Sequence, residues 1–348
     1  MSILPAVPLS ILDLAPVGEG STPAEAVQAT LALARRADEL GYTRFWLAEH
    51  HSMPGIASSA PAVLIGAVAG ATGRIRVGSG GVMLPNHAPL VVAEQFGTLA
   101  ALYPDRIDLG LGRAPGTDQR TAAALRRSAA ALSADDFPEQ LGELARFLAG
   151  EFPAGHPYAA IQAVPHAAPP PPIWLLGSSM YSAELAGILG LPFAFAHHFS
   201  GLNTLPALDT YRSAFRPSAA LDEPYAMVTV QVVCAPDDDE ADRIALPAAL
   251  SFLRLRQGRP GRLPTPEEAA AYPWRPDERA FVAQRRHGQA IGGPETVRAA
   301  LGQLLDATAA DELMISTLVH SPADRLRTVE LVHGMFRTAN EPDYLTMG

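Results

Sequence analysis

The chain of 348 residues contains no lysine, so all 26 of its basic residues are arginine. This absence excludes enzymes that form a Schiff base with a substrate or with pyridoxal phosphate, and it excludes P-loop nucleotide hydrolases, because each class requires a particular amine. Cys234 is the only cysteine, so neither an intrachain disulfide nor a thiolate zinc site is expected.

Excess positive charge and long apolar runs are absent as well. The net charge is −10 and the pI is about 5.5, which argues against a nucleic-acid partner and against binding to an anionic membrane surface. Residues 1–16 lack the basic and long apolar regions of a signal peptide, and no later stretch reaches about 18 unbroken apolar residues. We therefore expect a cytoplasmic protein with no membrane and no nucleic-acid partner.

Short apolar runs alternate with segments of helical periodicity along most of the chain. The expected strands are Leu9–Leu14, Arg44–His50, Ile75–Gly80, Ile107–Leu111, Ile173–Leu176, Pro192–Ala196, Tyr225–Ala235 and Glu312–Thr317. Eight strands that alternate with helices favour a (β/α)8 TIM barrel over a doubly wound sheet. We expect a single domain over residues 1–348.

The alternation is interrupted after the fourth and after the seventh expected strand. Residues 117–172 contain two helical segments, Thr121–Leu132 and Glu139–Leu148, followed by a stretch rich in proline and alanine. The second interruption covers residues 236–290. Within it, Leu255–His287 is rich in arginine, proline and glycine, which predicts a long mobile loop over one end of the barrel.

Polar side chains gather where the second expected strand ends, at Glu49, His50 and His51. The carboxyl ends of barrel strands are where ligands bind and catalytic side chains project. Strand alternation directs His50 and His51 to opposite faces, and no H-x-H or H-E-x-x-H spacing occurs, so no metal site is expected. His197 and His198 end the sixth expected strand and are either donors at the same rim or ordinary satisfied histidines.

Two neighbouring strand ends predict a phosphate site. The loop Gly177–Ser182, with the sequence GSSMYS, opens a helix, and a helix N-terminus favours an anion by roughly 0.3–1 kcal/mol. Ordinary N-capping by serine is the alternative for this loop alone. Arg113 ends the adjacent strand and supplies a guanidinium that suits phosphate. The pair Gly80-Gly81 permits close approach of the backbone to a flat ligand, although a glycine bulge is also common there.

Five segments together resemble the bacterial-luciferase-like flavin monooxygenases, and most closely the alkanal-monooxygenase-like subgroup. These segments are WLAEHH at 46–51, VGSGGVMLPNHAPL at 77–90, EQFGTL at 94–99, RIDLGLGRAPG at 106–116 and GSSMYSAELAGILGLPFAFAHHF at 177–199. The resemblance extends from Leu9 to about Phe215 and resumes weakly at 291–301 and 311–316.

The resemblance implies a (β/α)8 barrel that binds FMN. Arg113 and the serines of the GSSMYS loop would hold the phosphate. A non-proline cis peptide often backs the isoalloxazine at the position of Gly80-Gly81 in the family, and apolar walls would exclude water. The implied FMN contacts are Leu12, Gly80, Gly81, Met83, Arg113, Leu176, Gly177, Ser178, Ser179, Met180 and Ser182.

His50 matches the active-site histidine of the family, beside the reactive edge of the flavin. With a pKa near the working pH, its neutral imidazole is expected to take and return the proton as a C4a-hydroperoxyflavin forms and collapses. The resemblance implies a two-component monooxygenase: a separate NAD(P)H:flavin reductase supplies reduced FMN, and O2 oxygenates a small, apolar organic substrate. No G-x-G-x-x-G fingerprint follows a strand, which is consistent with an external reductant.

The chain departs from luciferase proper at two positions. Gly112 replaces a reactive thiol, which argues against light emission, and Ser178 replaces a carboxylate, which alters how the phosphate is held. The segment Leu255–His287 does not match the family, in which this region covers the substrate. The identity of the substrate is therefore open.

Two other functions remain possible on the same fold. An F420-dependent hydride-transfer oxidoreductase would need more basic residues than Arg113 near its acidic cofactor tail. A non-catalytic flavin-binding accessory protein is disfavoured by the presence of His50. The apolar helices Ala60–Ala71 and Pro89–Ala101 suggest a subunit interface of a homo-oligomer, with packing on the barrel alone as the alternative.

Overall fold

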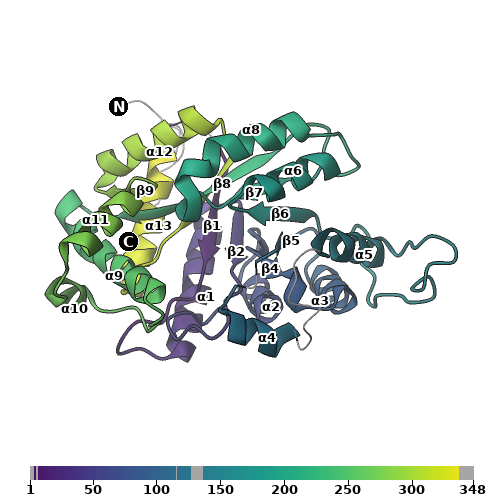
Figure 1. Cartoon of the computed structure of the whole chain (residues 1–348), viewed down its shortest axis with the longest axis horizontal. Helices are drawn as coiled ribbons and strands as arrows, with labels where there is room; N and C mark the ends of the chain where they lie inside the picture. The colour runs from purple at the N-terminus through teal and green to yellow at the C-terminus, as the bar shows by residue number, and fades with distance from the viewer. Residues whose placement is uncertain (1–3, 5–6, 115, 127–135, 337–348) are drawn as a thin grey trace.

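The computed structural model describes residues 4, 7–114, 116–126 and 136–336, and within them eight parallel strands close into a barrel surrounded by helices (Figure 1). The ring runs β10-β1-β2-β3-β5-β6-β7-β8 and closes by pairing of β8 with β10. These strands are β1 (Leu9–Asp13), β2 (Arg44–Leu47), β3 (Arg76–Ser79), β5 (Ile107–Gly112), β6 (Ile173–Gly177), β7 (Phe193–Phe195), β8 (Ala226–Cys234) and β10 (Glu312–Ser316). The predicted TIM barrel is confirmed.

Two short strands extend this sheet. β4 (Val82–Met83) pairs with β5, and β9 (Gln289–Gly292) pairs with β8. β8 is long enough to bond β10 along its first part and β9 from Gln231 onward. The sequence did not predict β9, because its four residues show no alternation of their own and its strand character depends on the partner.

The helices cover the outside of the barrel (Figure 1). They are α1 (Pro23–Leu40), α2 (Pro61–Ala71), α3 (Pro89–Leu102), α4 (Gln119–Arg126), α5 (Phe137–Ala149), α6 (Met180–Leu189), α7 (His197–Ser200), α8 (Thr204–Ala214), α9 (Asp238–Arg256), α10 (Pro266–Ala271), α11 (Pro276–Arg286), α12 (Pro294–Thr308) and α13 (Pro322–Phe336), with 3-10 turns η1 (Leu84–Asn86) and η3 (Gly201–Asn203). Of the predicted helix Thr121–Leu132, residues 127–132 lie outside the described residues. Within the described residues, no helix combines the length and apolar character that a membrane crossing requires.

Local sequence determines where the first helix begins and ends. The Thr22 hydroxyl accepts from the Glu25 backbone N–H at 3.2 Å, and the Glu25 carboxylate accepts from the Thr22 backbone N–H at 2.7 Å. Pro23 occupies the first helical position, and Gly41 ends the helix in the left-handed region with φ of 86°. This capping box and glycine stop are sequence signals that need no tertiary support.

Strand side chains alternate between two apolar layers. Trp46 on β2 packs inside the barrel with Leu12 and Trp174, whereas Phe45 and Leu47 pack outward in the layer beneath the helices. The rings of Trp46 and Trp174 meet edge to face with centroids 5.2 Å apart. Because the barrel interior is filled, ligands are expected at the mouth, where the carboxyl ends of the parallel strands meet.

The prediction of a long mobile loop over Leu255–His287 was wrong. This segment contains α10 and α11, which pack together with α9 (left side of Figure 1). The Phe252 and Phe281 rings stack with centroids 5.8 Å apart, and the Trp274 indole N–H donates to the Ala269 carbonyl at 3.0 Å. The two helices are short, and their stability comes from these aromatic contacts, so periodicity alone did not predict them.

Candidate active site

Glu49 anchors the end of β2 at the mouth of the barrel. Its buried carboxylate accepts hydrogen bonds from His51 Nε2 at 2.8 Å, from His87 Nε2 at 2.9 Å and from the Met83 backbone N–H at 3.0 Å. Burial alone would raise the pKa of Glu49, but the hydrogen bonds from His87 and His51 hold it below its usual value. His51 is therefore a structural residue, and His87 is a partner that the sequence did not identify.

His50 projects into a cavity at the same end of the barrel. Its backbone N–H donates to the Ser58 carbonyl at 2.9 Å, while its ring Nδ1 is buried with no hydrogen-bond partner among the described residues. Burial lowers the pKa of His50 to about 4, so the expectation of a pKa near the working pH was wrong. The imidazole is neutral at pH 7 and has an unused ring nitrogen for a ligand.

His197 and His198, at the start of α7, are satisfied histidines. His197 Nδ1 lies 2.7 Å from the Thr204 hydroxyl oxygen, and His198 Nδ1–H donates to the Thr229 carbonyl at 3.1 Å. Burial lowers the pKa of His197, and it lowers the pKa of His198 to about 4, helped by nearby positive charge at Arg285. These contacts fit the interpretation of His197 and His198 as ordinary satisfied histidines, which the sequence left open beside a role as donors at the rim.

Acid should destabilise the protein through His50 and His198. Because the folded pKa of each lies near 4 and the unfolded value near 6.5, the unfolded chain binds more protons between these values, and stability falls as pH decreases from 6.5 to 4. The loss is on the order of 3 kcal/mol for each histidine. Urea unfolding at pH 7.5, 6 and 5 measures it. His198→Gln should show a shallower decline than the wild type, and an unchanged decline would contradict the assignment.

Arg113 and the loop before α6 converge, as predicted. The Arg113 guanidinium lies over the Tyr181 ring, 4.3 Å from its centroid, and it forms no ion pair with a carboxylate in the described part of the chain. Ser179 precedes α6 in an extended conformation, and its side chain makes no capping hydrogen bond. A Cβ at Gly177 would lie 2.4 Å from the Ser182 Cβ, so only glycine permits this tight turn. Tyr181 was not predicted as part of this site.

Glycine backbone meets the predicted apolar walls at the barrel mouth. The Gly80-Gly81 peptide is cis, and a Cβ at Gly80 would lie 2.5 Å from Leu12 Cδ1. A Cβ at Gly110 would lie 2.9 Å from Leu176 Cδ1, and a Cβ at Gly112 would lie 2.8 Å from Met83 Sδ. The structure therefore brings Leu12, Met83 and Leu176 against the ends of β3 and β5. Met180, the first residue of α6, is exposed.

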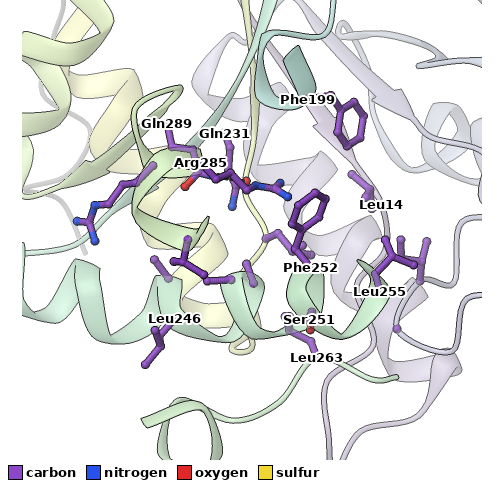
Figure 2. A pocket seen from close by; sticks show the side chains of 18 of the residues that line it. Leu14, Phe199, Gln231, Leu246, Ser251, Phe252, Leu255, Leu263, Arg285 and Gln289 are labelled. Carbon is purple, nitrogen blue, oxygen red and sulfur yellow. Dashed lines mark hydrogen bonds between the residues drawn. The ribbon is translucent and has the colours of Figure 1, made fainter. Parts of the chain in front are cut away.

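A largely apolar cavity borders His50 (Figure 2). Its walls come from the strand ends and from α9 and α11, and they include Leu14, Met53, Ile56, Phe199, Gln231, Leu246, Phe252, Leu255, Val282, Arg285, Gln289 and Leu318. Among the predicted site residues, all of which the structure describes, His50 alone lines this cavity. The sequence did not identify the cavity residues of α9 and α11: a helix was expected to begin in the charged run Asp237–Asp242, but without a role in the site, and the α11 segment was interpreted as a loop.

The described residues contain no group of three or more histidine, cysteine, aspartate and glutamate side chains that could hold a metal ion. At this end of the barrel, the neutral imidazole of His50, the guanidinium of Arg113 beside a helix N-terminus and the guanidinium of Arg285 are available to a ligand. These donors suit an organic cofactor with an anionic tail.

Comparison with known proteins gives matches over most of the chain. The model of the family described as luciferase-like monooxygenase matches residues 7–312. A protein from Escherichia coli (strain K12) named luciferase-like monooxygenase is 48% identical over 325 residues, covering 93% of this chain and 96% of its own. The N-acetyl-S-alkylcysteine monooxygenase of Bacillus subtilis (strain 168) is 36% identical with the same coverage.

Solved structures share the whole architecture. The crystal structure of apo-MsnO8 has a TM-score of 0.86 and 42% identity, covering 95% of this chain and 97% of that one. The oxygenating constituent of 3,6-diketocamphane monooxygenase from Pseudomonas putida, in complex with FMN, has a TM-score of 0.71 and 22% identity, covering 95% and 98%. At that identity the second structure is evidence for the fold alone.

Proposed function

Because the chain belongs to the luciferase-like monooxygenase family, we propose that it is the oxygenating component of a two-component FMN-dependent monooxygenase. Reduced FMN, delivered by a separate NAD(P)H:flavin reductase, would supply the two electrons needed to place one atom of O2 in an organic substrate and the other in water. The observation that carries this proposal is His50, a neutral imidazole with an unused buried nitrogen, in the wall of an apolar cavity.

The residues present fit FMN. Arg113, the backbone N–H groups that open α6, and the hydroxyls of Ser178, Ser179 and Ser182 would hold the phosphate. Glycine at Gly80-Gly81 lets the backbone pack closely against Leu12 and the Gly110 carbonyl, where a Cβ would collide, and it presents a backbone surface without side chains, which suits a flat ring. One guanidinium matches a single phosphate and favours FMN over a cofactor with a longer acidic tail.

His50 and the apolar cavity have separate roles in the proposed reaction. Held neutral by burial, His50 can accept a hydrogen bond at Nδ1 without bringing charge into the site. Side chains of α9 and α11 close the cavity with apolar surface, which excludes water from the reacting atoms and slows wasteful loss of the activated oxygen. The substrate would lie in this cavity beside His50.

Rapid mixing tests the proposal. Photoreduced FMN bound to the protein is mixed with oxygenated buffer while flavin absorbance is followed. We expect reoxidation to be at least tenfold slower than that of free reduced FMN, because the site protects bound oxygen species. Reoxidation at the rate of free FMN would refute the monooxygenase, and binding of F420 would then be measured by absorbance titration.

We further propose that the protein is a homo-oligomer that associates through α2 and α3. These helices leave apolar side chains exposed, with exposed fractions of 72% at Val63 and 63% at Leu102. Val63→Glu should shift the protein to the monomer in sedimentation velocity, because a charge would be buried at the interface. Leu202→Glu, at an exposed apolar residue on η3, is the matched control and should leave the oligomer intact. A monomeric wild type would contradict the proposal.

A further inference from the structure

Arg285 is a cation without a counter-charge among the residues that the structure describes. Its Nη1 is buried with no hydrogen-bond partner among the described residues, and no carboxylate there forms an ion pair with it. The next residue, Arg286, is paired with Asp242. A buried charge that lacks a partner costs stability, so its presence calls for an explanation.

Arg285 is held in place by an aromatic ring. Its guanidinium carbon lies 3.4 Å from the centroid of the Phe252 ring, and Phe252 stacks in turn on Phe281. Figure 2 shows the side chain extending from α11 across the cavity above Phe252. Because stacking fixes the plane of the guanidinium while leaving its N–H edge available, Arg285 is oriented to accept a planar anion.

The described cavity wall around Arg285 supplies no unpaired negative charge. The one acidic side chain that lines the cavity is Asp242, which pairs with Arg286. Gln231 and Gln289 line the cavity as well and hydrogen-bond to each other at 2.8 Å. Burial lowers the pKa of Arg285 to about 10, so the guanidinium remains charged at pH 7. The cavity thus combines one unpaired positive charge with largely apolar walls.

We propose that Arg285 binds a carboxylate on the substrate and thereby directs the apolar part of that molecule toward His50. This inference rests on the proposed function in taking the cavity as the substrate site. A carboxylate matches the planar fork of a guanidinium with two parallel hydrogen bonds, and the apolar walls suit a hydrocarbon body. The substrate class is therefore an amphipathic carboxylic acid, which refines the sequence-based expectation of a small apolar molecule.

Comparing carboxylates with the corresponding amides tests whether Arg285 binds a carboxylate. Isothermal titration calorimetry with FMN-loaded protein compares octanoate with octanamide, phenylacetate with phenylacetamide, and dodecanoate with dodecanamide. We expect the wild type to prefer at least one carboxylate over its amide by tenfold or more, since a hydrogen bond to a charged group contributes about 1.5–3 kcal/mol. Arg285→Gln should remove that preference. Arg279→Gln, at an exposed arginine on the same helix, should retain it.

Three outcomes would overturn the inference: no carboxylate preference in the wild type for any pair, a preference that survives in Arg285→Gln, or an equal loss in Arg279→Gln. FMN affinity and circular dichroism of each variant establish that it is folded. Since these titrations involve no oxygen chemistry, a carboxylate preference that depends on Arg285 would stand even if the rapid-mixing experiment refuted the monooxygenase.

Thermal unfolding without ligand gives a second, independent test. Arg285→Met keeps the length and the packing on Phe252 but removes the uncompensated charge, so the melting temperature should rise by about 2 °C or more. This exchange of stability for binding is expected of a functional cation. A lower melting temperature would show that the guanidinium supports the fold, and Arg285 would then be a structural residue.

Discussion

Replacing His50 with asparagine should abolish the protected reoxidation of bound reduced FMN while leaving FMN affinity within about twofold. The imidazole Nδ1 has no protein partner among the described residues, so its hydrogen bond is available to a ligand, and losing a positioned acid or base costs about 10²–10⁴-fold in the step that it assists. Stopped-flow absorbance gives the rate, and a peroxidase-coupled assay gives the hydrogen peroxide released. We expect both to approach the values for free FMN.

His197→Asn is the matched control for His50. This histidine lies at the same end of the barrel, but its Nδ1 already forms a hydrogen bond with the Thr204 hydroxyl. Its loss should therefore leave the reoxidation rate unchanged. If both variants behave alike, the effect is structural and His50 has no direct role. If His50→Asn retains slow reoxidation, the imidazole takes no part in the oxygen chemistry.

The low pKa of His50 also predicts the pH dependence of the reaction. With a pKa near 4 in the folded protein, His50 stays neutral from pH 5 to pH 8 and contributes no transition in that range. A reoxidation rate that changed with a midpoint near 6.5, and that lost this change in His50→Asn, would show that ligand binding restores an ordinary histidine pKa.

The barrel was predictable because its signals are local. Each strand reads as an apolar run, and caps such as Thr22 with Glu25 are short sequence patterns. The convergence of Arg113 with the GSSMYS loop was predictable for a related reason: consecutive strands in a barrel are neighbours, so features that follow them meet at one rim. The contact between Arg113 and Tyr181 agrees with that inference.

The cavity could not be predicted, because its wall depends on contacts between distant segments. Phe281 lies in a stretch with little periodicity, and its stacking on Phe252 joins α11 to α9 at this wall. The partnership of Glu49 with His87 joins residues far apart in sequence. The pKa of His50 depends on burial, which no local pattern states. Nothing in the sequence distinguished Arg285 from the other arginines among the 26 basic residues.

Arg113→Gln should weaken FMN binding by about 10- to 150-fold, the effect of removing charge-assisted hydrogen bonds of about 1.5–3 kcal/mol. Fluorescence titration measures it for FMN and, in parallel, for riboflavin, which lacks the phosphate. Riboflavin affinity should not change, because the guanidinium is expected to contact the phosphate alone. Arg120→Gln, an exposed arginine at the start of α4, controls for net charge and should bind both flavins as the wild type does.

The two flavins separate a ligand contact from a structural one. Arg113 also packs on Tyr181, so its loss can disturb the loop that opens α6. Such a disturbance would weaken riboflavin and FMN together, because the ring site at Gly80-Gly81 shares this end of the barrel. Two results together would identify the guanidinium as the phosphate ligand. The loss of affinity in Arg113→Gln would be confined to FMN, and high salt would lower FMN affinity in the wild type but not in Arg113→Gln. Equal losses for both flavins would place Arg113 in the scaffold, and the phosphate would then depend on the helix N-terminus.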